Sequence, residues 1–152
     1  IKKLNEYIFN SFNMEKYLTG LFIKFDELTG KVILYDMGHS YIYIYRNKEI
    51  YRIKTSEDNL PLGFTTDLNP VANQIKLEKN DILFAFTDGI PEQTNSTGKE
   101  YGLSKIRDLL NNYRDDNFEN ITDLLYDDIY NYRGFQPQHD DMTILILYYI
   151  GN

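Results

Sequence analysis

The sequence predicts an α+β domain in which helices pack against an antiparallel β-sheet. Residues 1–12 carry apolar side chains at helical spacing, residues 17–86 form short alternating or apolar runs separated by turn residues, and helical spacing returns over residues 103–132. A last apolar run, residues 142–150, predicts one more strand, which is expected to be buried. Consecutive strands joined by short turns pair in antiparallel fashion, and the helices then gather on a face of the sheet.

Two hairpins follow the first helix. Residues 17–26 and 31–38 flank a short turn that ends at Gly30, and residues 40–46 and 49–55 flank a turn around Asn47. Tyrosine is abundant, with 14 residues, and many of them alternate along these strands. This alternation favours the packed surface of a half-buried sheet over a platform that stacks sugars or bases.

The strongest strand signal is the continuous apolar run of residues 82–86, which is typical of a strand buried on both faces. Before it, residues 56–70 contain loop-forming Pro and Gly, and residues 71–78 predict a strand. Residues 93–102 predict a loop. The predicted order is therefore a helix, about six strands, two helices and a strand.

Composition excludes several classes of function. The 152 residues contain no Cys and only two His, so a disulfide framework and a zinc site rich in Cys or His are both excluded. The formal net charge of −7 argues against nucleic acid as the main partner. No apolar run is long enough to span a bilayer. We expect a cytoplasmic location, although the chain begins at Ile1 and an upstream segment of a longer parent could anchor it to a membrane.

Acidic residues lie at the ends of two apolar strands. Asp88 follows residues 82–86, and Asp140 and Asp141 precede residues 142–150. If these strands are antiparallel neighbours, the carboxylates meet at one edge of the sheet. Clustered carboxylates repel one another unless a cation neutralises them, and oxygen ligands suit Mg²⁺, Mn²⁺ or Ca²⁺. The alternative is that Asp-Gly forms a turn and that the acids stay solvated beside the strands.

Three motifs resemble the SpoIIE/RsbU-like branch of the PPM-class protein phosphatases. The first is DILFAFTDGIPEQTNSTGKEYG, the second is HDDMTILIL, and the third is GKVILYDMGHSYIYIYR with its central Gly38-His39; the LPLGF stretch of residues 60–64 also resembles a family element. They occur in the family's order and extend over nearly the whole chain. The resemblance implies a PPM-like antiparallel sandwich with helices packed outside.

The resemblance also implies roles for particular residues. Asp88 and Asp140 are expected to bind metal, while Asp141 and Gly89 are expected to support these ligands without binding the ion. For His39 an imidazole that closes a turn is favoured over a place near the substrate. His139 and Glu92 are expected in exposed loops, Asp115-Asp116 in a solvated loop, and Asp127-Asp128 on the polar face of the last helix.

The family places a further metal-binding Asp, in a Gly-Asp motif, upstream of the region that this sequence matches. Residues 1–152 are therefore expected to be the C-terminal portion of one phosphatase domain, incomplete at its N-terminus and inactive in isolation. Strand edges left without neighbours would favour a homo-oligomer. A sensor or regulatory domain is expected upstream in the parent.

The resemblance implies that the complete enzyme uses two Mn²⁺ or Mg²⁺ ions to hydrolyse phosphoserine or phosphothreonine on a protein. By family analogy the substrate is a bacterial regulatory protein such as an anti-sigma-factor antagonist. Two alternatives are a catalytically incomplete, phosphatase-like module that binds a partner, and a Tyr-rich ligand-binding β-domain.

Overall fold

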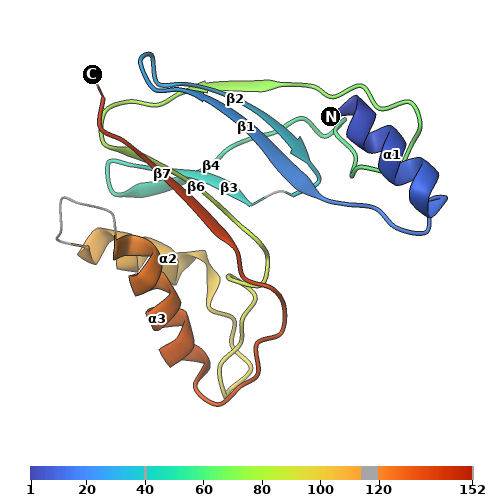
Figure 1. Ribbon diagram of the computed structural model, residues 1–152. Helices are drawn as coiled ribbons and strands as arrows, with labels where there is room; N and C mark the ends of the chain where they lie inside the picture. The colour runs from blue at the N-terminus through green and yellow to red at the C-terminus, as the bar shows by residue number, and fades with distance from the viewer. Residues whose placement is uncertain (40, 114–119, 152) are drawn as a thin grey trace. The chain divides into compact units, whose positions relative to one another are not determined.

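A computed structural model describes residues 1–39, 41–113 and 120–151 (Figure 1). The chain divides into two compact units. Unit 1 comprises Ile1–Ser40, Ile53–Lys79 and Tyr149–Asn152, and unit 2 comprises Tyr41–Arg52 and Asn80–Tyr148. No helix within the described ranges is both long and apolar enough to cross a membrane.

Unit 1 contains one helix and a three-stranded antiparallel sheet. The helix is α1 (Lys2–Phe12), and the strands are β1 (Gly20–Asp26), β2 (Lys31–Met37) and β5 (Asn73–Lys76), in the order β1-β2-β5. The predicted helix, first hairpin and strand are confirmed, and each strand is shorter than its apolar run.

Gly30 is required at the turn between β1 and β2. Its φ is +69°, and a Cβ there would lie 2.7 Å from the Leu77 backbone oxygen and 2.7 Å from Cε1 of Tyr149. The backbone N–H of Leu77 donates to the Gly30 oxygen at 2.8 Å. The absent side chain therefore lets this turn pack directly against the chain that follows β5.

A buried asparagine fixes α1 to the loop of residues 60–65. The Asn5 side-chain oxygen accepts from the Gly63 N–H at 2.8 Å, and its Nδ2 donates to the Thr65 oxygen at 2.8 Å. Ile8 packs beside this contact with Leu62 and other buried apolar residues. The LPLGF stretch therefore folds against the helix.

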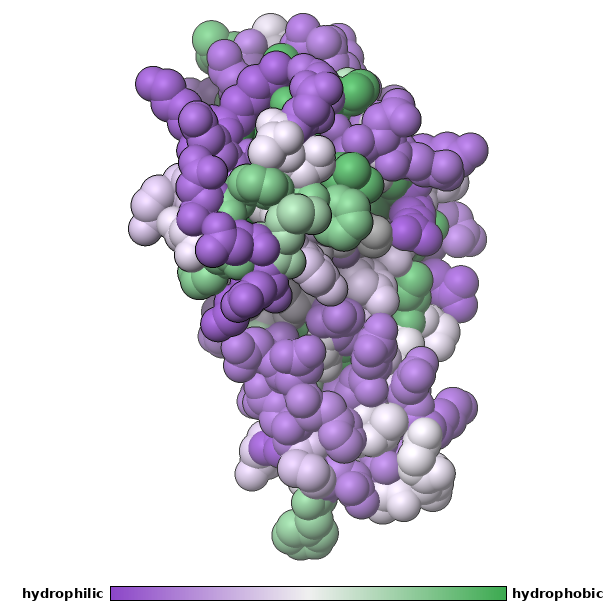
Figure 2. All heavy atoms as spheres, turned by 90° about the vertical axis from the view of Figure 1, so that its right-hand side faces the viewer, coloured by the Kyte–Doolittle hydropathy of each residue, from purple (hydrophilic) through white to green (hydrophobic). Residues whose placement is uncertain are grey.

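Unit 1 also exposes apolar side chains at the end of α1 and after it. Phe12, Met14 and Leu18 are exposed, and so is Phe64 of the loop attached to the helix. Figure 2 shows apolar side chains gathered among polar ones in the upper part of the face it presents. Most other side chains in that view are hydrophilic.

Unit 2 contains a four-stranded sheet and two helices. The strands are β3 (Ile42–Arg46), β4 (Glu49–Arg52), β6 (Asp81–Phe86) and β7 (Ile144–Tyr149), in the order β4-β3-β6-β7, and the helices are α2 (Gly102–Asn112) and α3 (Ile121–Arg133). The second hairpin and both predicted helices are confirmed.

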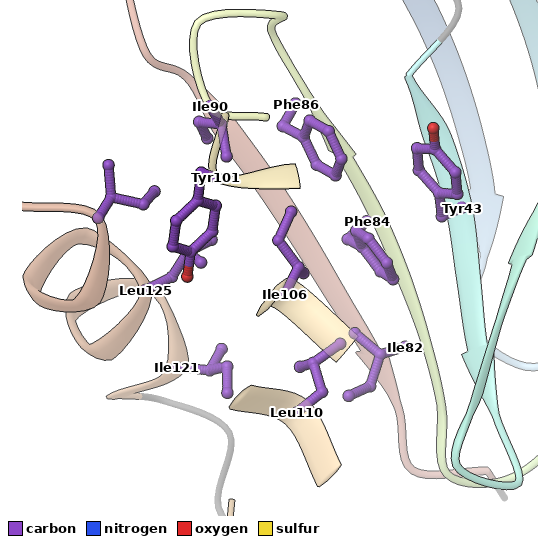
Figure 3. Close-up of a cluster of buried hydrophobic side chains, with 11 residues drawn as sticks. Tyr43, Ile82, Phe84, Phe86, Ile90, Tyr101, Ile106, Leu110, Ile121 and Leu125 are labelled. Carbon is purple, nitrogen blue, oxygen red and sulfur yellow. The ribbon is translucent and has the colours of Figure 1, made fainter. Parts of the chain in front are cut away.

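The core of unit 2 lies between this sheet and its helices (Figure 3). The rings of Tyr43, Phe84 and Phe86 stack at centroid distances of 5.4–5.8 Å, and Ile106 of α2 and Leu125 of α3 are buried in the same cluster. These two helices thus bury their apolar faces on strands β3 and β6.

Strands β6 and β7 differ in burial. Every residue of β6 is buried, which confirms the prediction for residues 82–86, because β6 lies between β3 and β7. The prediction that residues 142–150 form a buried strand was wrong. β7 is the end strand of its sheet, its residues are only partly buried, and Leu145 is 47% exposed.

Candidate metal site

The end of β6 and the start of β7 are joined by a group of hydrogen bonds. The Thr87 N–H donates to the Thr143 oxygen at 3.0 Å, and the Thr143 N–H donates to Thr87 Oγ1 at 2.9 Å. At the opposite ends of the strands the Tyr148 hydroxyl donates to Asn80 Oδ1 at 3.0 Å. The strands therefore run in opposite directions, as predicted from the sequence.

Gly89 lets the two acidic segments approach each other. It is buried, and a Cβ at this position would lie 2.6 Å from the Asp141 backbone oxygen and 3.1 Å from that of Asp140. Thr87 adds a bond from its hydroxyl to the same Asp141 oxygen at 2.8 Å. The Thr-Asp-Gly segment and the Asp-Asp segment are therefore packed backbone to backbone.

Each of the two predicted ligands presents its carboxylate at the surface. Asp88 and Asp140 are exposed. Oδ1 of Asp88 accepts from the Gly89 N–H at 3.0 Å, and Oδ1 of Asp140 accepts from the Asp141 N–H at 2.7 Å. Both carboxylates are thus oriented by the backbone amide of the next residue.

The carboxylates of Asp88 and Asp140 are the right type of ligand for a hard divalent cation, but two carboxylates are few for a metal site. Carboxylate oxygens are the ligands that Mg²⁺ and Mn²⁺ prefer. Within residues 1–39, 41–113 and 120–151, no group of three or more His, Asp or Glu side chains is placed to hold an ion. Asp88 and Asp140 can supply part of a metal site, and a binuclear site needs further ligands.

Glu92 and Tyr41 form a polar pair beside Asp88. The backbone N–H of Glu92 donates to the backbone oxygen of Asp88 at 3.0 Å. The Tyr41 hydroxyl donates to Glu92 Oε1 at 3.0 Å. Burial, the hydrogen bond with Glu92 and the negative charges of Glu92 and Asp88 raise the pKa of Tyr41 to about 12. Glu92 is exposed, as predicted, but its hydrogen bond with Tyr41 was not predicted.

The loop after β6 is tied to the loop that carries Asp140. Buried Gln93 donates from Nε2 to the Pro137 oxygen at 3.1 Å, and Thr94 Oγ1 lies 2.9 Å from Nε2 of His139. His139 is exposed, as predicted. Sequence reasoning missed Gln93, although a polar residue inside the TDG-containing motif is the signal that could have identified it.

The remaining predicted residues belong to other segments of the chain. His39 belongs to unit 1, where its backbone N–H donates to Oδ1 of buried Asp36 at 2.7 Å. Asp115 and Asp116 lie outside the described residues. On α3, Asp127 is exposed, and Asp128 accepts from the hydroxyl of buried Tyr101 at 2.6 Å.

Comparison with known proteins identifies the family. The sequence model described as Stage II sporulation protein E (SpoIIE) matches residues 1–149. The phosphoserine phosphatase RsbU of Bacillus subtilis is 21% identical over 97% of this chain and 43% of its own length. The chain belongs to the SpoIIE family.

Solved structures agree with this fold. The phosphatase domain of SpoIIE from Bacillus subtilis aligns with a TM-score of 0.67 and 19% identity, over 97% of this chain and 72% of that chain. The SiaA-PP2C domain of Pseudomonas aeruginosa aligns with a TM-score of 0.64 and 19% identity, over 79% of this chain and 47% of that chain. The predicted fold, antiparallel sheets with helices of the PPM (PP2C) type, is confirmed.

Proposed function

We propose that this chain is the C-terminal portion of one metal-dependent protein serine/threonine phosphatase domain. The observation that carries the proposal is the packing of Gly89 against the Asp140 and Asp141 carbonyls, which joins two acidic segments at one end of the β6–β7 pair. The chain spans 43% of RsbU, so the ligands that complete the site are proposed to come from the rest of the domain.

Each residue of the proposed site has a distinct task. Asp88 and Asp140 supply anionic oxygens, and the neighbouring amides orient those oxygens. Gly89 and Thr87 hold the two segments together. When bound, two Mn²⁺ or Mg²⁺ ions would provide Lewis-acid activation of a water molecule for in-line attack on phosphorus.

The proposed substrate is phosphoserine or phosphothreonine on a bacterial regulatory protein, of the kind represented by anti-sigma-factor antagonists. Support comes from the likeness to RsbU, which is itself a phosphoserine phosphatase. A regulatory domain is proposed upstream in the parent. The particular regulatory protein that serves as substrate is not part of this proposal.

The test is hydrolysis of a phosphoserine peptide by the full-length protein that carries this chain. We expect turnover with Mn²⁺, loss of turnover with a chelator, and loss in Asp88→Asn. Asp127→Asn is the matched control, because Asp127 is an exposed carboxylate on α3 outside the site. Chelator-resistant turnover, or an active Asp88→Asn protein, would contradict the proposal.

A second candidate is a phosphatase-like module that binds a partner without hydrolysis. It is favoured by the small number of clustered carboxylates among the described residues. The same assay separates the two candidates, because this module would give no Mn²⁺-dependent turnover even in the full-length protein.

A further inference from the structure

Two hydrogen-bonded links join the loop after β6 to the segment that leads into β7. In the first link the Thr87 hydroxyl donates to the Asp141 backbone oxygen at 2.8 Å. In the second link Nε2 of Gln93 donates to the Pro137 backbone oxygen at 3.1 Å. The chain from Thr87 to Gln93 and the chain from Pro137 to Asp141 are therefore the two sides of a closed ring.

Both proposed metal ligands lie within this ring, Asp88 on the first side and Asp140 on the second. Each side is also folded by a hydrogen bond of its own. The backbone N–H of Glu92 donates to the Asp88 backbone oxygen at 3.0 Å, and Nε2 of Gln138 donates to the Asp140 backbone oxygen at 2.8 Å. Because two short, folded sides are joined at both ends, the ring limits how far the two carboxylates can separate.

The amide of Gln93 forms the second link at a cost in stability. The residue is 0% exposed, and Nε2 donates to the Thr94 backbone oxygen at 3.1 Å as well as to Pro137. Two carbonyl acceptors fix the orientation of the amide, and among the described residues its buried Oε1 has no hydrogen-bond partner. A buried acceptor of this kind destabilises the folded state. The contribution of Gln93 therefore lies in the link itself.

Neighbouring contacts hold the second link in place. Oγ1 of Thr94 lies 2.9 Å from Nε2 of His139, which joins the same two segments a second time. The backbone N–H of Tyr101 donates to the Gln93 backbone oxygen at 2.8 Å, and the hydroxyl of this buried tyrosine donates to Asp128 of α3 at 2.6 Å. The second link is thus attached to the core of unit 2.

We propose that Gln93 is a positioning residue of the metal site, which acts by holding the Asp140 segment at a fixed distance from Asp88. This inference rests on the proposed phosphatase function. A site that is ordered before the ion arrives loses less conformational freedom on binding, so breaking the second link weakens metal binding. Gln93 supplies no ligand itself, and the loss therefore falls on metal affinity and not on the chemical step.

The experiment compares the full-length parent with Gln93→Met, which keeps the length of the side chain and removes the amide. Calorimetric titration should give a dissociation constant for Mn²⁺ about tenfold higher than in the parent. Turnover of a phosphoserine peptide at saturating Mn²⁺ should stay within about twofold, because the chemical step is unchanged. The urea midpoint should move by less than about 0.5 M, since lost bonds and the lost unpartnered acceptor act in opposite directions.

Thr94→Val tests the same link at a position that is only partly buried. It removes the hydroxyl beside His139 and should raise the dissociation constant for Mn²⁺ about threefold. Thr94→Ser keeps the hydroxyl and should restore the parental value. Thr97→Val is the matched control, because the hydroxyl of exposed Thr97 donates to Asn95 Oδ1 at 2.7 Å within the same loop.

A further measurement needs no metal. In the metal-free full-length protein, the backbone amides of residues 138–141 should exchange with deuterium about tenfold faster in Gln93→Met than in the parent. Exchange in β6 should be unchanged, because this strand is held by β3 and β7 on its two sides.

Parental Mn²⁺ affinity in both Gln93→Met and Thr94→Val would overturn the positioning role and leave the proposed function in place. A fall in turnover at saturating Mn²⁺, together with a large fall in the urea midpoint, would assign Gln93 a structural role and overturn the proposal too. Absence of Mn²⁺ binding and of turnover in the parent would remove the proposed function and this inference with it.

Discussion

Asp140 and Asp141 are adjacent residues with the same side chain, but their proposed contributions to the site use different atoms. Asp140 presents a carboxylate oriented by the next amide, whereas Asp141 contributes its backbone oxygen to the hydroxyl of Thr87 at 2.8 Å. Replacing the side chain of Asp140 therefore removes a proposed ligand, whereas replacing the side chain of Asp141 leaves its backbone contact with Thr87 intact.

We expect Asp140→Asn to abolish Mn²⁺-dependent phosphatase activity of the full-length protein and Asp141→Asn to reduce it much less. An amide lacks the negative charge that a site for two divalent ions needs. Initial rates at saturating Mn²⁺ and direct Mn²⁺ titration of both variants measure this difference. Near-parental turnover in Asp140→Asn would show that the ligand is assigned wrongly.

Gly89→Ala is expected to destabilise the protein by about 1–3 kcal/mol and to weaken Mn²⁺ binding, since the new methyl group would push the Asp140 segment away. Urea denaturation and Mn²⁺ titration measure the two effects. Gly20→Ala in β1 is the matched control, because a Cβ at Gly20 meets nothing within 4 Å. Equal stability of the two variants would mean that the close approach at Gly89 can relax.

Glu92→Gln is expected to lower the pKa of Tyr41 from about 12 toward 10, because it removes a negative charge that disfavours the phenolate. In the parent, the folded state keeps the Tyr41 proton longer than the unfolded state does. This contribution to stability is therefore complete below pH 10 and is lost as the pH rises through about 12.

The measurement is an NMR titration of the Tyr41 ring carbon in both proteins. Glu100→Gln is the control, since Glu100 is exposed and is not among the groups that raise this pKa. An unchanged Tyr41 pKa in Glu92→Gln would show that Glu92 does not contribute to the shift.

The sequence predicted that Asp88 and Asp140 lie at neighbouring strand ends, because strand ends follow from apolar runs and turn residues. It did not locate the Tyr41–Glu92 bond or the contact of Gln93 with Pro137. Those contacts join residues far apart in the chain, and they depend on side-chain directions that are set only after β3, β6 and the loops are assembled.

At the scale of elements, period-two alternation and turn residues predicted the two hairpins correctly, and a continuous apolar run predicted β6. The position of β7 at the sheet edge could not be predicted in the same way. A continuous apolar run has the same appearance in a central strand and in an end strand, and its burial is decided by which neighbours the sheet provides.

Asp81→Asn is expected to destabilise unit 2 by about 2–3 kcal/mol, below the value for a fully buried pair, because the Arg46 side chain is 28% exposed. Nε and Nη2 of Arg46 donate to the two oxygens of Asp81 at 2.9 and 2.6 Å, which joins the end of β3 to the start of β6. Urea denaturation measures the loss.

Asp108→Asn provides the comparison for this ion pair. Oδ1 of Asp108 lies 3.8 Å from Nε of Arg107, and both side chains are largely exposed. Asp108→Asn should therefore lower the free energy of unfolding by less than about 0.5 kcal/mol. Similar losses in the two variants would mean that the forked geometry of the Arg46–Asp81 pair adds nothing.

At the scale of the whole chain, the small donor set limits metal affinity. We expect the 152-residue chain alone to bind Mn²⁺ with a dissociation constant of about 10⁻⁴ M or weaker, and to hydrolyse no phosphopeptide. Titration calorimetry and a phosphate-release assay check both expectations. Sub-micromolar binding of two ions would show that the chain supplies a complete site.

The end strand β7 bears on assembly. Its outer edge and the 47% exposed side chain of Leu145 offer a surface on which another strand can pair. We expect this open edge to cause self-association of the chain. The net charge of −7 does not prevent it, because salt confines the repulsion to about 8 Å. Light scattering at high protein concentration measures it, and Leu145→Lys should reduce it. A strictly monomeric chain would contradict the expectation.

The Thr87 hydroxyl has a consequence for slow motions near the site. It accepts from the Thr143 N–H and donates to the Asp141 oxygen, while the Thr87 N–H donates to the Thr143 oxygen. Neither amide can be released to solvent unless the other contacts also open. The amide protons of Thr87 and Thr143 should therefore exchange with deuterium at one common opening free energy, and Thr87→Val should accelerate the exchange at Thr143.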